Sequence, residues 1–253
     1  MSIKPIDMRR QAGYKKRSKS KDSGNPLLQK YRTNRTYNDY KIYMEDKSPA
    51  IVTQMDTVKG KRQKGQVLLT MLLLRNHVML LFLMPDCKQE SVKRCFDFLE
   101  KGLGNEAFKR LFKVFLTDNG SEFKDVDGLE LSDDLTIRTS LYYCDPMASW
   151  QKAEIEKNHE YIRYVIPQNT SLNPYTEYDI TLLMNHINST KRESLNGLSP
   201  YDMISQDDKD MLSLMKLMKM EIIPADYVNL TASLLKIDTA EAKESNNAKG
   251  AFE

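Results

Sequence analysis

The stretch KVFLTDNGSEF, residues 113–123, decides the fold that the sequence predicts. Residues 114–116 are a short apolar run of strand-forming side chains, and residues 117–120 all favour a turn. Asp118 therefore follows a buried strand directly, at a place where rigid backbone can hold a carboxylate at the edge of a sheet. An Asn-Gly pair after a strand is also a common hairpin signal, so the triplet alone leaves an ordinary turn open.

Length and composition limit the class of protein. The chain has 253 residues, of which 40% are hydrophobic, enough for one large core or two small ones. The longest apolar run, residues 67–84, is interrupted by polar residues at 75–77, so neither half reaches the roughly 20 residues of a membrane span. The basic N-terminus has no apolar segment behind it, and three scattered cysteines form no disulfide or zinc pattern. We expect a cytoplasmic protein with no membrane partner.

Basic charge is concentrated at the N-terminal end. Residues 1–47 carry 13 Lys and Arg against 5 Asp and Glu, whereas the whole chain has a net charge of only +3. Tyrosines are interleaved with the cations, and no apolar period is present. Such a segment lies along phosphates when nucleic acid is available. A solvated linker has the same composition, so both interpretations stay open.

Periodicity along the chain predicts alternating strands and helices. Apolar runs predict strands at residues 51–55, 67–74, 78–84, 114–116 and 141–144. Helical spacing predicts helices at 35–46, 90–101, 106–111, 150–165, 176–188, 201–204 and 207–220. The acidic stretch 122–139 fits neither pattern, and we expect an irregular surface excursion there.

Three acids stand out by their positions. Asp56 follows the first predicted strand, Asp118 follows the fourth, and a glutamate lies on the helix after the fifth. If the first and fourth strands are parallel neighbours, both aspartates emerge at the same edge of the sheet. Three oxygen donors without cysteines suit Mg²⁺ or Mn²⁺, and two such ions can clamp a phosphodiester during in-line phosphoryl transfer. Spacing alone does not establish this site, because a domain of this size contains many acids.

Three motifs in this order resemble a known family. IVTQMDTVKG (51–60), LTDNGSEF (116–123) and YYCDPMASWQKAEIEKNHEYIRYVIP (142–167) are similar to the integrase-type catalytic core of IS30-family insertion-sequence transposases, over roughly residues 35–204. The resemblance implies an α/β, ribonuclease H-like fold with a mixed five-stranded sheet, flanking helices and added C-terminal helices. It also implies a triad of two aspartates and one glutamate.

The domain plan that follows has four parts. We expect a basic arm with a short helix at 1–47, the catalytic core at 48–204, a helical extension at 205–238 and a disordered tail at 239–253. The family usually begins with a helix-turn-helix region that binds the ends of the element. No recognition-helix pattern precedes Arg35, so the chain could be a truncated product, a decayed copy or an isolated core.

The resemblance also selects one glutamate. The family motif reads Trp-Gln-Lys/Arg-Gly, two variable residues, Glu, and then Asn. Counting from Trp150 puts Ala153 at the glycine and Glu156 at the catalytic acid, and Glu154 falls on a variable position. Residues two apart on a helix point about 200° away from each other, so these two glutamates cannot share the role. The predicted catalytic and metal-binding residues are therefore Asp56, Asp118 and Glu156, with two Mg²⁺ or Mn²⁺ ions when DNA is bound.

Further residues are expected around the triad. Asn119, Asn158 and His159 match the family's supporting positions, although a turn role for the first and a structural role for the histidine fit as well. The predicted DNA contacts are Lys59, Lys61, Arg62, Lys64, Lys152, Lys157 and Arg163. For any single one of these cations, a solvated surface charge is the alternative.

The sequence thus predicts a DNA transposase that cleaves DNA strands and transfers the ends to a target. Transposases of this type pair two DNA ends, so the resemblance implies a homo-oligomer as well as DNA as partners. Two alternatives stay open: a catalytically idle or truncated DNA-binding remnant, and a ribonuclease H-type nuclease that shares the site but does not join strands.

Overall fold

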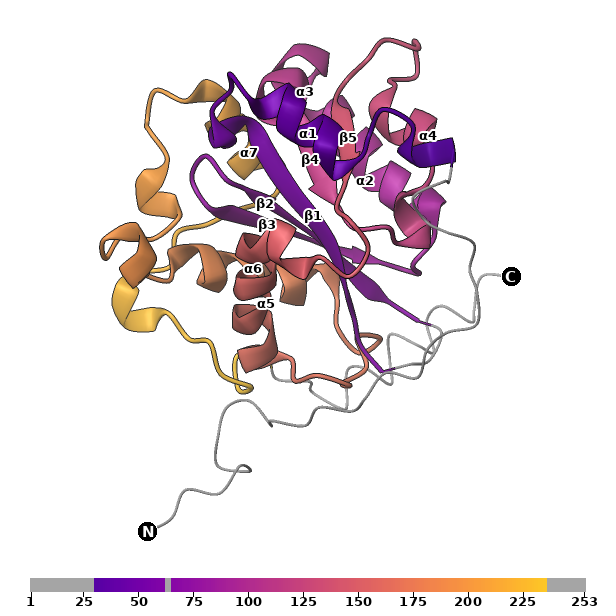
Figure 1. The fold of residues 1–253 in the computed structure, drawn as a ribbon. Coiled ribbons are helices and arrows are strands. Elements are labelled where there is room, and N and C mark those ends of the chain that lie inside the picture. The colour runs from indigo at the N-terminus through magenta and orange to yellow at the C-terminus, as the bar shows by residue number, and fades with distance from the viewer. Residues whose placement is uncertain (1–29, 62–64, 236–253) are drawn as a thin grey trace.

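One mixed sheet of five strands forms the centre of the domain (Figure 1). The computed structural model describes residues 30–61 and 65–235, which contain β1 (Val52–Lys59), β2 (Val67–Leu73), β3 (Val78–Met84), β4 (Val114–Thr117) and β5 (Ser140–Tyr143). The strand order is β3-β2-β1-β4-β5, with β1–β2 and β2–β3 antiparallel and β1–β4 and β4–β5 parallel. This is the ribonuclease H-like arrangement that the sequence predicted.

β1 is longer than the sequence predicted. The expected strand ended at Met55, whereas the observed strand continues to Lys59, because residues 53–59 pair without a break with residues 67–73 of β2. β4 pairs only with positions 52–54 of β1. Asp56 therefore lies inside β1, just beyond the part that β4 covers, and not after the end of the strand.

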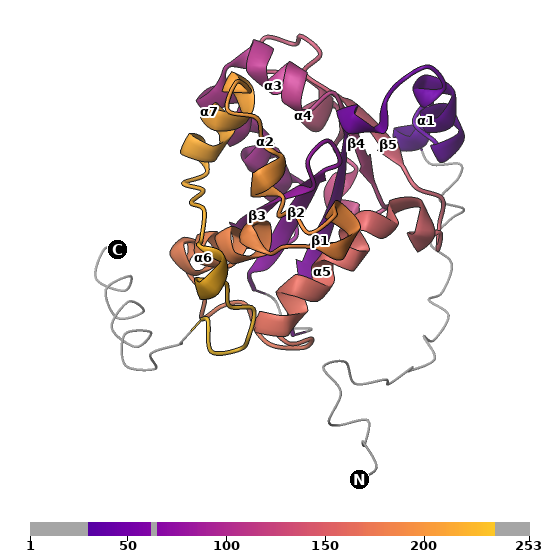
Figure 2. The ribbon, with the colours of Figure 1, turned by 90° about the vertical axis from the view of Figure 1, so that its left-hand side faces the viewer.

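Helices cover both faces of the sheet (Figure 2). α2 (Gln89–Leu103) and α3 (Asn105–Leu111) lie on one face, and α5 (Ala153–Val165) and α6 (Glu177–Ser189) lie on the other. The sequence predicted all four to within three residues at each end. The residues just before α5, predicted as its first turn, form a short 3-10 helix instead.

Local signals explain the ends of these helices. At the start of α6, Thr176 and Asp179 form a capping box in which each side chain accepts a hydrogen bond from the other's backbone N–H. Gly104 has a φ of +81°, a left-handed conformation that glycine adopts readily, and this allows α2 to end and α3 to begin at the same residue.

Two apolar clusters fill the space between sheet and helices. The larger one includes four phenylalanines that contact one another in sequence order or through Phe96, with ring centroids between 4.7 and 6.3 Å apart. They are Phe96 of α2, Phe108 of α3, Phe112 directly after α3 and Phe115 of β4. The smaller one joins β1, β4 and β5 and is covered by tyrosines of α1 (Tyr37–Met44). α1 was predicted at residues 35–46.

Residues 30–47, predicted as part of the basic arm, pack against the domain. Arg32 is only 1% exposed, and Tyr31 stacks edge-on against the buried Tyr143, with ring centroids 4.8 Å apart. Residues 1–29 of the predicted arm lie outside the described residues, as do residues 236–253 at the predicted tail.

The acidic stretch 122–139 is more ordered than predicted. It contains α4 (Val126–Glu130), and both Phe123 and Leu129 are fully buried. Arg138 is buried as well and donates hydrogen bonds to Asp97 and Glu100 of α2, at 2.9 and 2.8 Å. The expected surface excursion is therefore wrong, because contacts with a distant helix organise this segment.

The C-terminal part also packs on the core. α7 (Lys209–Leu217), shorter than the predicted 207–220, lies against α2 and α3, with Met211 and Leu214 fully buried. The part of the chain that the structure describes also contains the short 3-10 helices Lys30–Arg32, Pro49–Ile51, Ser121–Phe123, Ser149–Lys152, Glu193–Leu195, Tyr201–Met203 and Ala225–Tyr227. Within residues 30–61 and 65–235, no helix combines the length and apolar character needed to cross a membrane.

Candidate active site

The register of β1 and β4 brings the two predicted aspartates to one level. Gln54 of β1 lies opposite Leu116 of β4 in the parallel pair. Two residues further along, the same register puts Asp118 beside Asp56, because two parallel strands run in the same direction with the same rise per residue. The carboxylate of Asp118 accepts a hydrogen bond from the backbone N–H of Gly120 at 2.9 Å, which fixes its direction at the end of the strand.

A buried lysine bridges these carboxylates. The ammonium nitrogen of Lys152 is 2.8 Å from Oδ2 of Asp56 and 3.7 Å from Oδ2 of Asp118. Burial lowers the pKa of Lys152, but attraction by the two aspartates outweighs this, so that its pKa is raised above the ordinary value. The sequence predicted a DNA contact for Lys152, and the structure instead directs it into the acid cluster.

Glu156 of α5 lies near enough to Asp56 and Asp118 to interact with their charges. The helix is anchored to β1, because the backbone N–H of Ile155 donates to Oε1 of Gln54 at 2.8 Å. Burial, followed by repulsion from Asp56 and Asp118, raises the pKa of Glu156, against the opposing attraction of Lys152. Glu154, by contrast, is exposed. Of the two glutamates, Glu156 is the one that lies in the electrostatic field of both aspartates.

Asp118 has a perturbed pKa for related reasons. Burial raises the pKa of Asp118 most, and the negative charges of Asp56 and Glu122 raise it further, while Lys152 and the Gly120 N–H oppose the shift. Clustered like charges of this kind mark a candidate cation site. Hard carboxylate oxygens suit Mg²⁺ or Mn²⁺. The two aspartates already converge on one cation, the ammonium, although no three acidic, His or Cys side chains in the described residues are grouped closely enough to hold a metal as they stand.

His159 supports the backbone of the site. Its Nε2 is 2.9 Å from the hydroxyl of Thr70, which in turn donates to the carbonyl oxygen of Asp56 at 3.0 Å. A hydroxyl has one hydrogen, so Nε2 must be the donor in the first of these bonds. Burial, with the nearby charges of Lys152 and Arg163, lowers the pKa of His159 to about 3. The imidazole is therefore neutral at physiological pH.

Asn119 points away from the acids. Its amide nitrogen donates to the carbonyl oxygen of Cys144 at 2.8 Å, and its Oδ1 accepts from Tyr31 at 3.2 Å and from the guanidinium of Arg32. Arg32 also donates to the same carbonyl of Cys144, at 3.1 Å. These bonds tie together the loops that follow β4 and β5, so Asn119 positions the loop that carries Asp118.

Asn158 is also turned away from the predicted triad. It is 3% exposed, donates to the carbonyl oxygen of Glu154 at 2.8 Å and accepts from Arg192 at 2.8 Å. The guanidinium of Arg192 lies 4.8 Å from the ring centroid of Tyr161. Asn158 therefore links α5 to the segment after α6.

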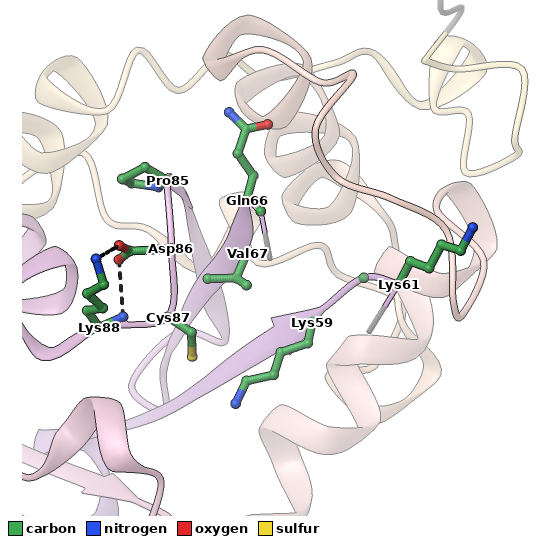
Figure 3. Close-up of a pocket in the computed structure, with 10 residues that line it drawn as sticks. Lys59, Lys61, Gln66, Val67, Pro85, Asp86, Cys87 and Lys88 are labelled. Atoms are coloured by element: carbon green, nitrogen blue, oxygen red, sulfur yellow. Dashed lines mark hydrogen bonds and ion pairs between the residues drawn. The ribbon is translucent and has the colours of Figure 1, made fainter. Parts of the chain in front are cut away.

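The remaining predicted DNA contacts are dispersed. Lys59 and Lys61 line a surface hollow of about 800 Å³ at the end of β1, and their side chains point away from each other (Figure 3). Lys157 is exposed on α5, and Arg163 donates to the carbonyl oxygen of Lys59 at 3.2 Å. The other two predicted cations, Arg62 and Lys64, lie outside the described residues.

Glu122 is a fourth acid that the sequence reasoning did not select. It is 3% exposed and accepts hydrogen bonds from Thr57 at 2.7 Å and Cys87 at 3.0 Å, and it pairs with Lys59 at 3.2 Å. These partners hold the loop after Asp118 against β1 and the start of α2. In the sequence, Glu122 is marked only by its position four residues after Asp118. That spacing does not distinguish a buried glutamate from an exposed one.

Comparisons with known proteins point to one kind of relative. No protein-family model matches the chain. ORF3 of Spiroplasma virus SpV1-R8A2 B, named as an integrase, is 28% identical over 154 residues, 61% of this chain and 45% of ORF3. The InsI transposase of IS30A from Escherichia coli (strain K12) is 30% identical over 83 residues, 31% of this chain and 22% of the transposase. The IS1086 transposase of Cupriavidus metallidurans is 29% identical over 66 residues, 26% of this chain and 20% of that protein.

A solved structure can be aligned as well. The catalytic core domain of BIV integrase covers 61% of this chain, with 93% of that core aligned, at a TM-score of 0.43 and 16% identity.

The class of protein follows from the sheet topology: the domain has a ribonuclease H-like fold. The chain is similar to IS30-type transposases, and this similarity confirms the resemblance read from its motifs. The aligned segments span less than half the length of each of these relatives.

Proposed function

We propose that this chain is the catalytic core of a DNA transposase that cleaves DNA strands and joins the ends to target DNA. The observation that carries the proposal is the meeting of Asp56 and Asp118, level on neighbouring parallel strands, at one cation. Glu156 lies in the field of both. The names of the relatives, which are transposases and an integrase, support a reaction on DNA.

Each side chain then has a stated part in the reaction. Asp56, Asp118 and Glu156 would hold Mg²⁺ or Mn²⁺ through carboxylate oxygens. Two such ions, when bound, would supply activation of the attacking oxygen and stabilisation of the leaving oxygen of a phosphodiester. The Gly120 N–H keeps the Asp118 carboxylate directed at the site, and neutral His159, through Thr70, keeps the backbone of Asp56 in place.

DNA is the proposed partner. Lys61, just after β1, and Lys157 on α5 are exposed cations that can contact phosphates, and Lys59 can do so where DNA competes with Glu122 for its ammonium. In this proposal residues 48–204 are the catalytic core, the basic charge of residues 1–47 contributes to DNA binding, and residues 205–238 extend the core. The protein acts on DNA in the bacterial cytoplasm as a homo-oligomer that pairs two DNA ends.

The test is strand cleavage and joining on supercoiled DNA with Mg²⁺ or Mn²⁺. Glu156→Gln removes a carboxylate from the site and is expected to reduce products roughly a hundredfold or more, since even outer-shell partners of metal ligands are worth 10 to 100-fold. Glu154→Gln, two residues away and exposed, is the matched control and should keep activity near that of the wild type.

Other results would change the assignment. Equal activity in both variants would refute the triad. Cleavage of an RNA–DNA hybrid without strand joining would indicate a ribonuclease H-type nuclease. A folded wild-type chain that binds DNA and yields no products with either ion would indicate a DNA-binding remnant.

A further inference from the structure

Lys152 lies where the two aspartates converge. It is the last residue of the 3-10 helix Ser149–Lys152, directly before α5, and only 3% of it is exposed. Its ammonium is 2.8 Å from Asp56 and 3.7 Å from Asp118, atom to atom. Lysine is almost never fully buried unless it is paired, so these two carboxylates are what keep its charge inside the protein.

The groups that face Lys152 are mainly negative. Besides the two aspartates, Glu156 of α5 interacts with the same ammonium. The thiol of Cys144 and the neutral imidazole of His159 also interact with it. Three carboxylates against one ammonium leave an excess of negative charge, so the cluster still attracts a further cation with Lys152 in place.

A divalent ion and the ammonium need the same oxygen atoms. Mg²⁺ takes oxygens at about 2.0–2.1 Å in a nearly rigid octahedron, whereas a charge-assisted N–H···O bond is about 2.7–2.9 Å long. Two cations on one pair of carboxylates also repel each other strongly at such short range. Binding of the ion therefore requires the ammonium to move aside, and the four-carbon stem of lysine is flexible enough for this.

We propose that Lys152 is a positioning residue that holds Asp56 and Asp118 together and competes with divalent ions for their oxygens, so that it sets the metal affinity of the site. This inference rests on the proposed function, because the divalent ion is the cofactor proposed there. It replaces the DNA-phosphate role that the sequence predicted for Lys152, which a buried ammonium cannot fill.

The test measures Mn²⁺ binding to the full chain by titration calorimetry, without DNA. Lys152→Met removes the competing charge and keeps the stem volume, and the Kd for Mn²⁺ is expected to fall roughly tenfold or more. Lys152→Arg is expected to raise the Kd, because a guanidinium pairs with carboxylates through two parallel bonds and stays charged. Lys113→Met is the control and should leave the Kd unchanged. Lys113 is exposed and directly precedes the first residue of β4, whereas Asp118 follows the last one.

The proposal requires the Kd for Mn²⁺ to fall in Lys152→Met and to rise in Lys152→Arg. A merely structural role of Lys152 would not shift the two values in opposite directions. An unchanged or raised Kd in Lys152→Met overturns the proposal, as does binding that survives Asp56→Asn. If Lys152→Met fails to fold by circular dichroism, Lys152→Arg decides: an unchanged or lowered Kd overturns the proposal. Failure of the proposed function looks different, because the affinities would then shift as expected while the Mn²⁺-loaded wild type leaves DNA uncut.

Discussion

Replacing His159 by glutamine is expected to remove a specific part of the protein's sensitivity to acid. In the folded protein, burial and neighbouring cations lower the pKa of His159 from 6.5 to about 3. Between these values the unfolded chain binds a proton that the folded chain does not. Above pH 6.5, the pKa of His159 in the unfolded chain, this group does not lower the stability of the folded protein. As the pH falls from about 6.5 toward 3, the unfolded chain gains a proton and the folded protein loses stability relative to it.

The magnitude follows from these two values. At pH 5 the imidazole is almost fully protonated in the unfolded chain and neutral in the folded protein, and this difference lowers the unfolding free energy by about 2 kcal/mol. At pH 7 the same difference lowers it by only about 0.2 kcal/mol. The result at pH 5 hardly depends on whether the folded value is about 3 or about 4. His159→Gln removes the titrating group but keeps an N–H donor for Thr70.

Urea unfolding at pH 7.0 and pH 5.0 measures the effect. The wild type should lose roughly 2 kcal/mol more than His159→Gln between the two pH values. The other two histidines, His77 and His186, titrate in both proteins and cancel in the comparison. Equal losses in the two proteins, within about 0.5 kcal/mol, would refute the lowered pKa of His159 in the folded protein.

Two further substitutions test contacts that organise the domain. Arg138→Met should lower the unfolding free energy by about 3–5 kcal/mol, because it removes a fully buried guanidinium that pairs with two carboxylates and donates to the carbonyl oxygens of Gly128 and Leu129. Arg110→Met, at an exposed ion pair, should change the urea midpoint little, and equal losses in the two variants would contradict the argument. Gly120→Ala would set a Cβ 2.7 Å from Oε2 of Glu122 and 3.0 Å from Oδ1 of Asp118, at a φ of −55° that alanine tolerates. We expect metal-dependent cleavage to fall roughly tenfold or more with a melting temperature within a few degrees of the wild type, and full activity would refute a fixed carboxylate geometry.

Regular local patterns could be predicted from the sequence. α2 buries one face, and that face is visible as apolar spacing along the chain. β4 could be predicted because its apolar run ends at a turn. The ribonuclease H-like fold followed from the motifs and is confirmed by the strand order.

Features that depend on distant partners could not be predicted. The extension of β1 past Asp56 requires pairing with β2, and the order in residues 122–139 requires α2 to cover Phe123 and accept the hydrogen bonds of Arg138. Neither partner is near in sequence, so local composition gave the opposite answer. The triad itself stays a prediction until the glutamate variants are measured.

The sequence by itself determined the approximate positions of the main strands and helices, the two aspartates that accompany β1 and β4, and the family that the motifs resemble. Those properties depend on spacing along one chain. Only the tertiary structure decided that Lys152 turns inward to bridge Asp56 and Asp118, that His159 is neutral, and that Glu122 is buried. The physical reason is that a charged side chain is exposed by default, and only partners brought together by folding can compensate its burial.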